Sequence, residues 1–411
     1  MFRCMLKSAG VLLLTPLCAL AFDAVDVLVP ASSGIYPAYP SEVLRPYDLW
    51  AQFGMMYDTN ILRRTTGDNS EVLTRLGVGG RMDQKVIGRQ SVHLEGRVDS
   101  YIYNKNSELD NIGYGGVAEW RYEIGNDLSG GIGASRRRFQ ANLSEIQRAQ
   151  YDPITETMLN ATARYRVGPH VGLRGGTAYI DYNRPSRQAS DTKTLVVTGG
   201  ADYVTDLGNV LGVEVAEAKG DAPVNQLVDP LGLFVDNGYR QHDVGVITTW
   251  VISPYMRVAG RVGRTNRQYT QLPGRDFSGP TWNVMAQWLP SAKTMLTAES
   301  SKHVSSIIEI GASHVVVKGF AIGPGWAPTA KLNFQARLLR QHQVFEGDPA
   351  AILGVTPVRE EFIRGYRLGS YWEYSRQVHF TFSLDHGERE SNILGRNYRY
   401  NAGIAQVRYI F

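Results

Sequence analysis

Three neighbouring pairs hold the side-chain types that acid–base and nucleophilic catalysis use: Asp385 with His386, His242 with Asp243, and Ser313 with His314. A catalytic base and the group that orients it must lie within hydrogen-bond distance, and a nucleophile must lie equally close to its base. Adjacent residues of a strand point to opposite faces, so these pairs do not meet that requirement unless a loop bends them back. No nucleophile elbow or comparable motif accompanies them. The sequence therefore predicts a protein without enzymatic activity, and an enzyme is the weaker alternative.

Metal and cofactor sites are not supported by the spacing either. The eight histidines form no His-x-x-x-His pair, and the Asp, Asn and Gly residues never assemble a calcium-loop pattern. The 43 Lys and Arg residues nearly balance the 39 Asp and Glu residues, and the net charge is +4. Nucleic-acid binding needs a strong basic excess or a basic stripe. We therefore expect no cofactor, no metal and no nucleic-acid partner.

Charged residues instead recur at every second position of apolar segments. In segment 92–102, apolar residues alternate with polar ones that include Glu95, Arg97 and Tyr101, and segment 378–385 alternates in the same way. A period of two is that of a β-strand with two unlike faces. A soluble β-sandwich would bury the apolar face, whereas a membrane barrel turns it to lipid and lines its lumen with the polar face. Alternation alone does not separate these two classes.

The lengths of the connections separate them. Between Tyr47 and Phe411 we count about 18 strand segments, with 16 also open because strand counts from sequence carry boundary errors. Short connections are expected near 82–90, 124–127, 168–169, 205–208, 253–254, 290–291, 323–328 and 375–376. Long connections include 62–69, 142–153, 183–191, 220–237, 268–280, 343–357 and 387–397. Short and long connections alternate, as periplasmic turns and extracellular loops do in outer-membrane barrels. The sequence therefore predicts an all-β, antiparallel, up-and-down transmembrane barrel.

This assignment places a set of charged and aromatic side chains in the lumen. The lumen-lining candidates are Arg97, Arg121, Arg137, Arg257, Arg261, Arg337, Arg367, Arg408, Glu95, Glu119, Tyr101 and Tyr371. Basic residues outnumber acidic ones among the polar-face positions that we assign, and such a bias tunes the selectivity of a pore. We hypothesise a lumen that favours neutral or acidic saccharides, with tyrosine rings stacking on sugars. The alternative is that these charges satisfy one another across neighbouring strands.

The last segment carries a terminal signature. Val407, Tyr409 and Phe411 belong to an apolar face that reaches the end of the chain. The last strand must pair with the first to close a barrel, because an open edge does not occur in lipid. A terminal aromatic residue on such a strand resembles the signal that the barrel assembly machinery recognises. We expect these three residues to face outer-membrane lipid and to direct assembly.

The first 21 residues have the features of a secretory signal peptide. Arg3 and Lys7 precede a short apolar run, and Ala19 and Ala21 stand at the −3 and −1 positions of a cleavage site. The apolar run is too short to span a membrane as a helix. Residues 1–21 are therefore expected to be removed after export across the inner membrane of a Gram-negative cell.

The remainder divides into a tail and a barrel. Residues 22–46 are rich in proline and are expected to form an irregular tail that faces the periplasm or plugs the lumen, whereas 47–411 form the barrel. Cys4 and Cys18 both lie in the signal peptide, so the mature chain is expected to have neither a disulfide framework nor a cysteine metal site.

Two short segments resemble a known family. Tyr57-Asp58-Thr59-Asn60-Ile61-Leu62-Arg63 and Gly325-Trp326-Ala327-Pro328-Thr329-Ala330-Lys331 are similar to segments of the EpsL-like outer-membrane β-barrel porins found in exopolysaccharide gene clusters. The resemblance covers nearly the whole mature chain in length and order of elements. It implies a channel for exopolysaccharide biosynthesis or export, with the polymer and periplasmic export components as partners. The alternative is a general or saccharide-selective solute porin.

Overall fold

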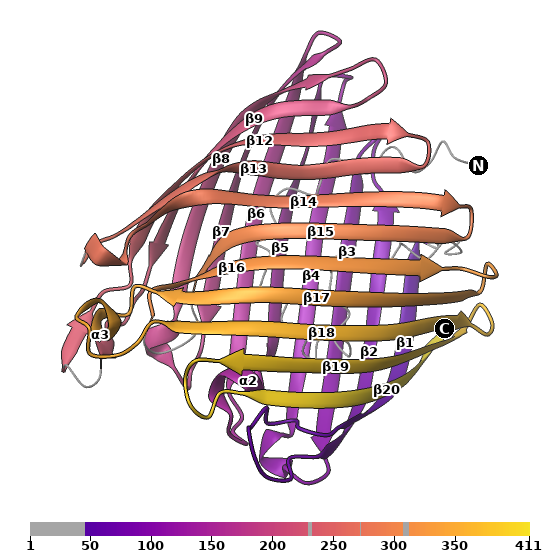
Figure 1. Cartoon of the computed structure of the whole chain (residues 1–411). Coiled ribbons are helices and arrows are strands. Elements are labelled where there is room, and N and C mark those ends of the chain that lie inside the picture. Colours follow the sequence, from indigo (N-terminus) through magenta and orange to yellow (C-terminus); the bar gives the residue numbers. More distant parts are fainter. Residues whose placement is uncertain (1–45, 229–231, 272, 307–311) are drawn as a thin grey trace.

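The computed structural model describes residues 46–228, 232–271, 273–306 and 312–411, and within them it forms an 18-stranded antiparallel barrel (Figure 1). The barrel strands are β1 (Tyr47–Asp58), β2 (Glu71–Lys85), β3 (Ser91–Tyr103), β4 (Asn111–Ile124), β5 (Leu128–Gln140), β6 (Pro153–Val167), β7 (Val171–Asn183), β8 (Thr192–Val204), β9 (Val210–Asp221), β12 (Tyr239–Ser253), β13 (Met256–Tyr269), β14 (Phe277–Ser291), β15 (Thr294–Ser306), β16 (His314–Trp326), β17 (Leu332–Glu346), β18 (Arg359–Glu373), β19 (Val378–Ser391) and β20 (Tyr398–Ile410). The predicted fold class and the preferred strand count are confirmed.

Each barrel strand pairs with the next in sequence, and β1 pairs with β20 to close the wall. At this seam Phe53 lies opposite Val407, and the backbone N–H of Phe411 donates to the carbonyl of Leu49 at 2.9 Å. In Figure 1 the strands β12–β20 of the near wall cross the strands β1–β9 of the far wall, as tilted strands of a closed barrel do.

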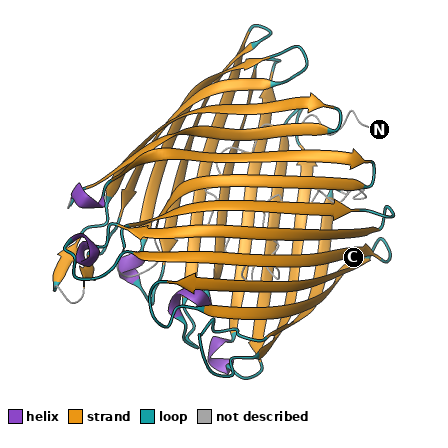
Figure 2. Ribbon diagram, in the orientation of Figure 1, coloured by secondary structure: helices purple, strands orange, loops and turns teal. Residues whose placement is uncertain are grey.

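Small elements lie in the long connections at one end of the barrel (Figure 2). They are the helices α2 (Leu143–Ile146) and α3 (Pro349–Ile352), the 3₁₀ turns η2 (Ser107–Leu109), η3 (Gln188–Ser190) and η4 (Pro273–Arg275), and the hairpin β10 (Gln226–Val228) with β11 (Leu233–Val235). The sequence did not predict this hairpin. Among the described residues, no helix is long and apolar enough to cross a membrane.

Several predicted connections are shorter than expected because strands run on through them. Strand β16 continues to Trp326, β14 runs from Phe277 through Pro280 to Ser291, and β19 extends to Ser391. Glycine and proline in these stretches indicated turns. Pro280, however, lies outside the pairing of β14 with β15, which begins at Trp282, and Pro324 lies at an interruption of the pairing of β16 with β17, so neither proline has to donate on that side. The short connections still all lie at one end and the long ones at the other, where they are the periplasmic turns and extracellular loops of the fold.

The outer face of the wall is apolar. On β1, Leu49 is 59% exposed and Phe53 43%, whereas Trp50 between them is only 7% exposed. Trp50 therefore points to the interior, away from the outer face on which Leu49 and Phe53 lie. Near the periplasmic turns, Trp326 stacks on Phe334 with ring centroids 5.7 Å apart. Aromatic residues at this height are typical of the girdle where a barrel meets the membrane interface.

Candidate functional site

The lumen-lining candidates all lie at inward positions of their strands. Glu95, Arg97 and Tyr101 alternate on β3 with Leu94, which is 40% exposed on the outer face, and cross-strand partners share a face. By the same alternation the inward face also carries Glu119 and Arg121 on β4, Arg137 on β5, Arg257 and Arg261 on β13, Arg337 on β17, Arg367 and Tyr371 on β18, and Arg408 on β20.

Most of these arginines lie against carboxylates. The guanidinium of Arg137 is 2.8 Å from Glu156, and that of Arg337 is 2.7 Å from Glu299. Each pair joins two strands that lie side by side or one strand apart, so the charges brace the wall from inside. The carboxylates Glu156 and Glu299 were missing from the predicted set, although each lies on the polar face of an alternating segment and that periodicity was the available signal.

Further pairs follow the same arrangement. Glu214 accepts from Arg261 at 3.1 Å and lies 3.2 Å from Arg174, and Arg367 is 2.6 Å from Asp385. Other cross-strand pairs are Arg164 with Asp202, Arg81 with Asp48, and Arg257 with the amide oxygen of Gln287. Two pairs lie within one strand: Arg121 with Glu119 on β4, and Arg97 with Asp99 on β3. The inward charges are therefore largely paired with one another. The net electric field in the lumen is weaker than an unpaired basic lining would give.

A polar network crosses the seam where the barrel closes. The amide of Gln52 on β1 donates to Asp99 on β3 at 2.8 Å and accepts from Arg408 on β20 at 3.2 Å. Asp99 also accepts from Arg75 on β2 at 3.0 Å. Four consecutive strands around the closure are thus tied by side chains as well as by the backbone ladder, and Gln52, which sequence reasoning missed, joins them.

Tyr371 and Tyr101, the two tyrosines proposed to stack on sugar rings, differ in their surroundings. Tyr371 lies within 5.6 Å of His379, ring centroid to centroid, on the inward face. Tyr101 is only 7% exposed, because extracellular loops fold inward over β1, β2, β3 and β20 and cover it. The ring of Tyr101 is therefore packed beneath loop residues and is not presented to the open lumen.

These inward-folded loops form an apolar cluster at the extracellular mouth, which we call the mouth cluster. It comprises Met56, Ile61, Leu62, Leu73, Tyr101, Tyr103, Leu109, Leu143, Tyr400, Ala402 and Ile404. Ile61 and Leu62 come from loop 59–70, and Leu143 comes from α2 in loop 141–152. Leu109 comes from η2 in loop 104–110. Three loops, the outermost two separated by four strands, thus share one buried core inside the barrel wall.

A buried ion pair anchors the first loop in this cluster. Asp58 and Arg63 are 2.9 Å apart, and their side chains are 0% and 2% exposed. The Arg63 guanidinium also lies 3.6 Å from the ring centroid of Tyr400. Arg63 has φ of 54°, which turns the chain back toward the wall. A buried charge held by both a carboxylate and an aromatic face fixes the loop in one position.

The loops are also tied to one another. The Arg64 Nε donates to the carbonyl of Gln147 at 2.8 Å, and the Gln147 amide donates to the carbonyl of Arg63 at 2.7 Å. From the wall, Arg389 on β19 donates to the carbonyl of Ser144 at 3.1 Å. The first and third extracellular loops therefore form one unit fastened to the strands beside the seam.

The fourth loop joins the third through charges. Arg187 lies 2.6 Å from Asp152 and 3.5 Å from Glu145. Burial raises the pKa of Glu145 above its usual value of 4.5, and the positive charges of Arg187 and Arg184 oppose this rise. Asp152 adds to the rise as a second negative charge. This contact is outside the membrane-spanning strands, and we expect it to depend on pH.

The structure corrects the sequence argument on Ser313 and His314. The Ser313 hydroxyl lies 3.0 Å from Nδ1 of His314, whose Nε2 lies 3.2 Å from a carboxylate oxygen of Glu346. The contact exists because Ser313 precedes β16 and is not bound by strand alternation. Ser313 is 7% exposed and His314 is 0% exposed, and the imidazole stacks on Tyr269 at 5.8 Å. The group is therefore buried against the wall.

The other two acid–base pairs stay apart, as the alternation predicted. His386 contacts Asn401 at 2.8 Å on the outer face, while Asp385 binds Arg367 inside. Asp243 accepts from Gln241 at 2.7 Å, also inside. Within the part of the chain that the structure describes, no group of three or more His, Asp or Glu residues is arranged to hold a metal ion.

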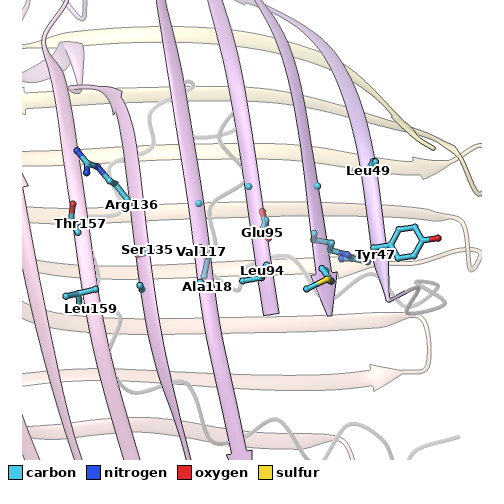
Figure 3. Close-up of a pocket in the computed structure, with 16 residues that line it drawn as sticks. Tyr47, Leu49, Leu94, Glu95, Val117, Ala118, Ser135, Arg136, Thr157 and Leu159 are labelled. Atoms are coloured by element: carbon cyan, nitrogen blue, oxygen red, sulfur yellow. The ribbon is translucent and has the colours of Figure 1, made fainter. Parts of the chain in front are cut away.

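A groove of about 690 Å³ lies on the outer wall of β1–β6 and not in the lumen (Figure 3). Its floor is a row of glycines that lie opposite one another, Gly80, Gly96 and Gly116, and Arg136 continues this row on β5. Because glycine has no side chain, this row forms the floor of an apolar groove on the face of the wall that meets lipid.

Comparisons with known proteins give structural neighbours only. No family model and no curated protein matches the sequence. The chain is similar to the outer membrane protein OpdK from Pseudomonas aeruginosa, with a TM-score of 0.48 and 11% identity over 89% of this chain and 99% of that one. It is also similar to a BenF-like porin from Pseudomonas fluorescens, with a TM-score of 0.49 and 9% identity over 90% of this chain and 100% of that one. The barrel assignment rests on the strand pairing described above.

Proposed function

We propose that this chain is an outer-membrane channel for the passive passage of small polar solutes, including saccharides. One observation carries the proposal: an 18-stranded closed wall with an apolar exterior and ionised side chains inside. Barrels of 16 to 18 strands are wide enough to leave an aqueous channel unless it is plugged. We therefore prefer a solute porin, the alternative in the sequence analysis, to polymer export, which the family resemblance implied.

The paired lumen charges support a channel of modest ionic selectivity. The guanidinium of Arg337 with Glu299, and that of Arg137 with Glu156, offer hydrogen bonds to a passing hydroxyl from both partners. Neutral polar solutes fit such a lining, because they exchange hydrogen bonds with it without disturbing an isolated charge. The mouth cluster adds a size limit at the extracellular end.

Export of exopolysaccharide remains the second candidate, because the resembling segment 57–63 contains Asp58 and Arg63, the anchor of the first loop. If the protein exports a polymer, the first extracellular loop, 59–70, is the part that opens to let the polymer pass. Deletion of the gene distinguishes the two: export predicts loss of secreted polymer with unchanged uptake of small solutes, and a solute channel predicts the reverse.

Liposome swelling tests the main proposal directly. The full barrel, reconstituted in vesicles, is expected to admit mono- and disaccharides at rates that fall with solute size. A matched variant, Glu299→Gln with Arg337→Gln, removes one balanced charge pair and leaves polar side chains at both positions, so neutral sugars should enter at nearly unchanged rates. Vesicles that exclude every sugar would overturn the channel proposal.

The buried Ser313 gives a test of the enzyme alternative. If Ser313 were a nucleophile, Ser313→Ala would abolish hydrolysis of short-chain p-nitrophenyl esters and of phospholipid by the purified barrel. We expect wild type and variant to be equal and at background. A rate above background that disappears in Ser313→Ala would establish a barrel enzyme instead.

A further inference from the structure

Four basic side chains form a patch on the outer face of four adjacent strands. The β15–β18 patch consists of the exposed Lys318, Arg340 and Arg364 and of Lys302, which is half-buried with its amine 6.0 Å from the ring centroid of Phe277. Lys318 and Arg340 are exposed and alternate with outward apolar residues, Phe320 at 52% and Leu338 at 54% exposure. The patch is therefore on the lipid-facing side of the wall, a surface on which charge is costly and needs a reason.

The cross-strand register opposes like charges within this patch. Lys302 lies directly opposite Lys318, and Arg340 lies directly opposite Arg364. Lys318 in turn lies opposite His342. Directly opposed like charges destabilise a sheet, since the side chains are within about 4.5–5.5 Å at Cβ. An anion that bridges them would convert this cost into a favourable contact.

Carboxylates lie on the β17–β19 side of the patch, where Glu360 is 3.3 Å from His342. Arg364 lies 2.9 Å from Glu388 and also contacts Glu390. Among the described residues, Lys318 and Arg340 have no carboxylate within ion-pair distance. The wall around β8 differs: there Lys193 lies opposite Asp181 on one side and Asp221 on the other. The unbalanced charge is thus a local feature and not a property of the whole circumference.

The height of the patch matches the outer membrane interface. Lys318 is eight positions along β16 from Trp326 at the periplasmic girdle, and Arg364 is eight positions along β18 from Trp372. At about 3.3 Å per residue and a tilt of about 35–45°, eight positions correspond to roughly 20 Å along the membrane normal. The apolar band of such barrels is about 25 Å tall, so the patch lies at its extracellular edge.

From these observations we infer that the β15–β18 patch binds the phosphate groups of a multiply phosphorylated glycolipid in the outer leaflet. Arg and Lys are the side chains best suited to phosphate oxygens, and Arg binds them in two parallel hydrogen bonds. The exposed Phe320, Leu338 and Tyr366 lie on the same face toward the girdle, where acyl chains of the same lipid would run. This surface is separate from the lumen and does not depend on what the channel carries.

Native mass spectrometry of the full barrel in detergent tests this inference, with bisphosphorylated lipid A as the probe. Wild type is expected to retain at least one lipid A molecule and to bind phosphatidylethanolamine more weakly. The double variant Lys318→Gln with Arg340→Gln should lower lipid A affinity about tenfold or more, since it removes two charge-assisted contacts. Lys193→Gln, which removes a balanced charge on the opposite wall, should change the affinity less than twofold.

Other outcomes would overturn the inference. Equal binding by the double variant and wild type, an equal loss in Lys193→Gln, or complete displacement of the lipid by millimolar inorganic phosphate would each exclude a lipid surface here. The double variant relieves repulsion between like charges, so it should fold and show the usual heat-modifiable migration. If it does not fold, Arg340→Gln alone is measured in its place, with an expected loss of about threefold or more from one lost contact.

Discussion

Single buried charges hold the mouth of this barrel in place. Arg63 is the clearest case, because its guanidinium is nearly inaccessible and contacts both Asp58 and the ring of Tyr400. Removal of one partner leaves the other charge buried without compensation, at a cost of about 3–5 kcal/mol. The other anchors of the loop are the buried side chains of Ile61 and Leu62 and the hydrogen bond from Arg64 to Gln147. We expect that they do not offset this cost, so that the loop leaves its position.

Arg63→Gln is therefore expected to release loop 59–70 from the mouth cluster. The expected results are a larger single-channel conductance and faster proteolysis within the loop, with the barrel itself still folded. Lys105→Gln is the matched control, because the Lys105 amine contacts Asp68 at 3.3 Å while both side chains are more than half exposed. Unchanged conductance in Arg63→Gln would show that this ion pair does not control the mouth.

For individual residues, the sequence was sufficient to predict which side chains point inward but not what surrounds them in the folded barrel. Arg97, Arg337 and Arg367 were placed from strand alternation alone, because the inward or outward direction of a side chain is a local property of its strand. The burial of Tyr101 was not accessible in that way. It depends on loops that reach the residue from elsewhere in the chain, as does the contact of Arg389 with Ser144 across 245 positions.

Among the elements, the third and fourth extracellular loops are expected to pack together in a pH-dependent way. The pKa of Glu145 is raised above 4.5 when the loops are packed together. The packed state thus binds a proton more readily than the unpacked state, and linkage makes packing more favourable as pH falls through the raised pKa. The gain is complete once pH is below the unpacked value near 4.5.

Channel recordings from neutral pH down to about pH 4.5 are expected to show growing occupancy of a closed or low-conductance state. Glu145→Gln should remove most of this change, because the amide stays neutral throughout and keeps the side chain's shape. A response to pH that is identical in Glu145→Gln and wild type would assign the titration to another group.

The terminal strand is the second element with a specific expectation. Tyr409 and Val407 lie on the outer face of β20, and the Phe411 ring is 64% exposed beside Tyr409, at 5.1 Å between centroids. Phe411→Asp places a charge on this outer face and removes the aromatic end of the strand. We expect a severalfold loss of protein in the outer membrane, with periplasmic accumulation or degradation, by heat-modifiable migration of membrane fractions.

Phe411→Trp is the control for that experiment, since it keeps an aromatic residue at the end of the strand. Normal membrane levels of Phe411→Asp would contradict the role given to this residue. The pairing of β20 with β1 over nine residue pairs would then suffice for assembly without the terminal ring.

At the scale of the whole molecule, the alternation of short and long connections predicted the closed barrel, and the count of period-two segments predicted about 18 strands with 16 also open. Hydropathy averages were uninformative because each strand divides its apolar residues from its polar ones by face. The additional hairpin β10–β11 escaped prediction, since its strands of three residues are too short for a period of two to be recognised. Its residues lie in the longest extracellular loop and outside the barrel wall.

The central claim is that water and small solutes pass through the interior of this 18-stranded wall. Single-channel recording on the full barrel in a planar bilayer tests it most directly. The account predicts discrete conductance steps with weak ion selectivity, because the lumen charges are mostly paired, and larger steps in Arg63→Gln. A correctly folded barrel that shows no conductance steps, either as wild type or as Arg63→Gln, would contradict it.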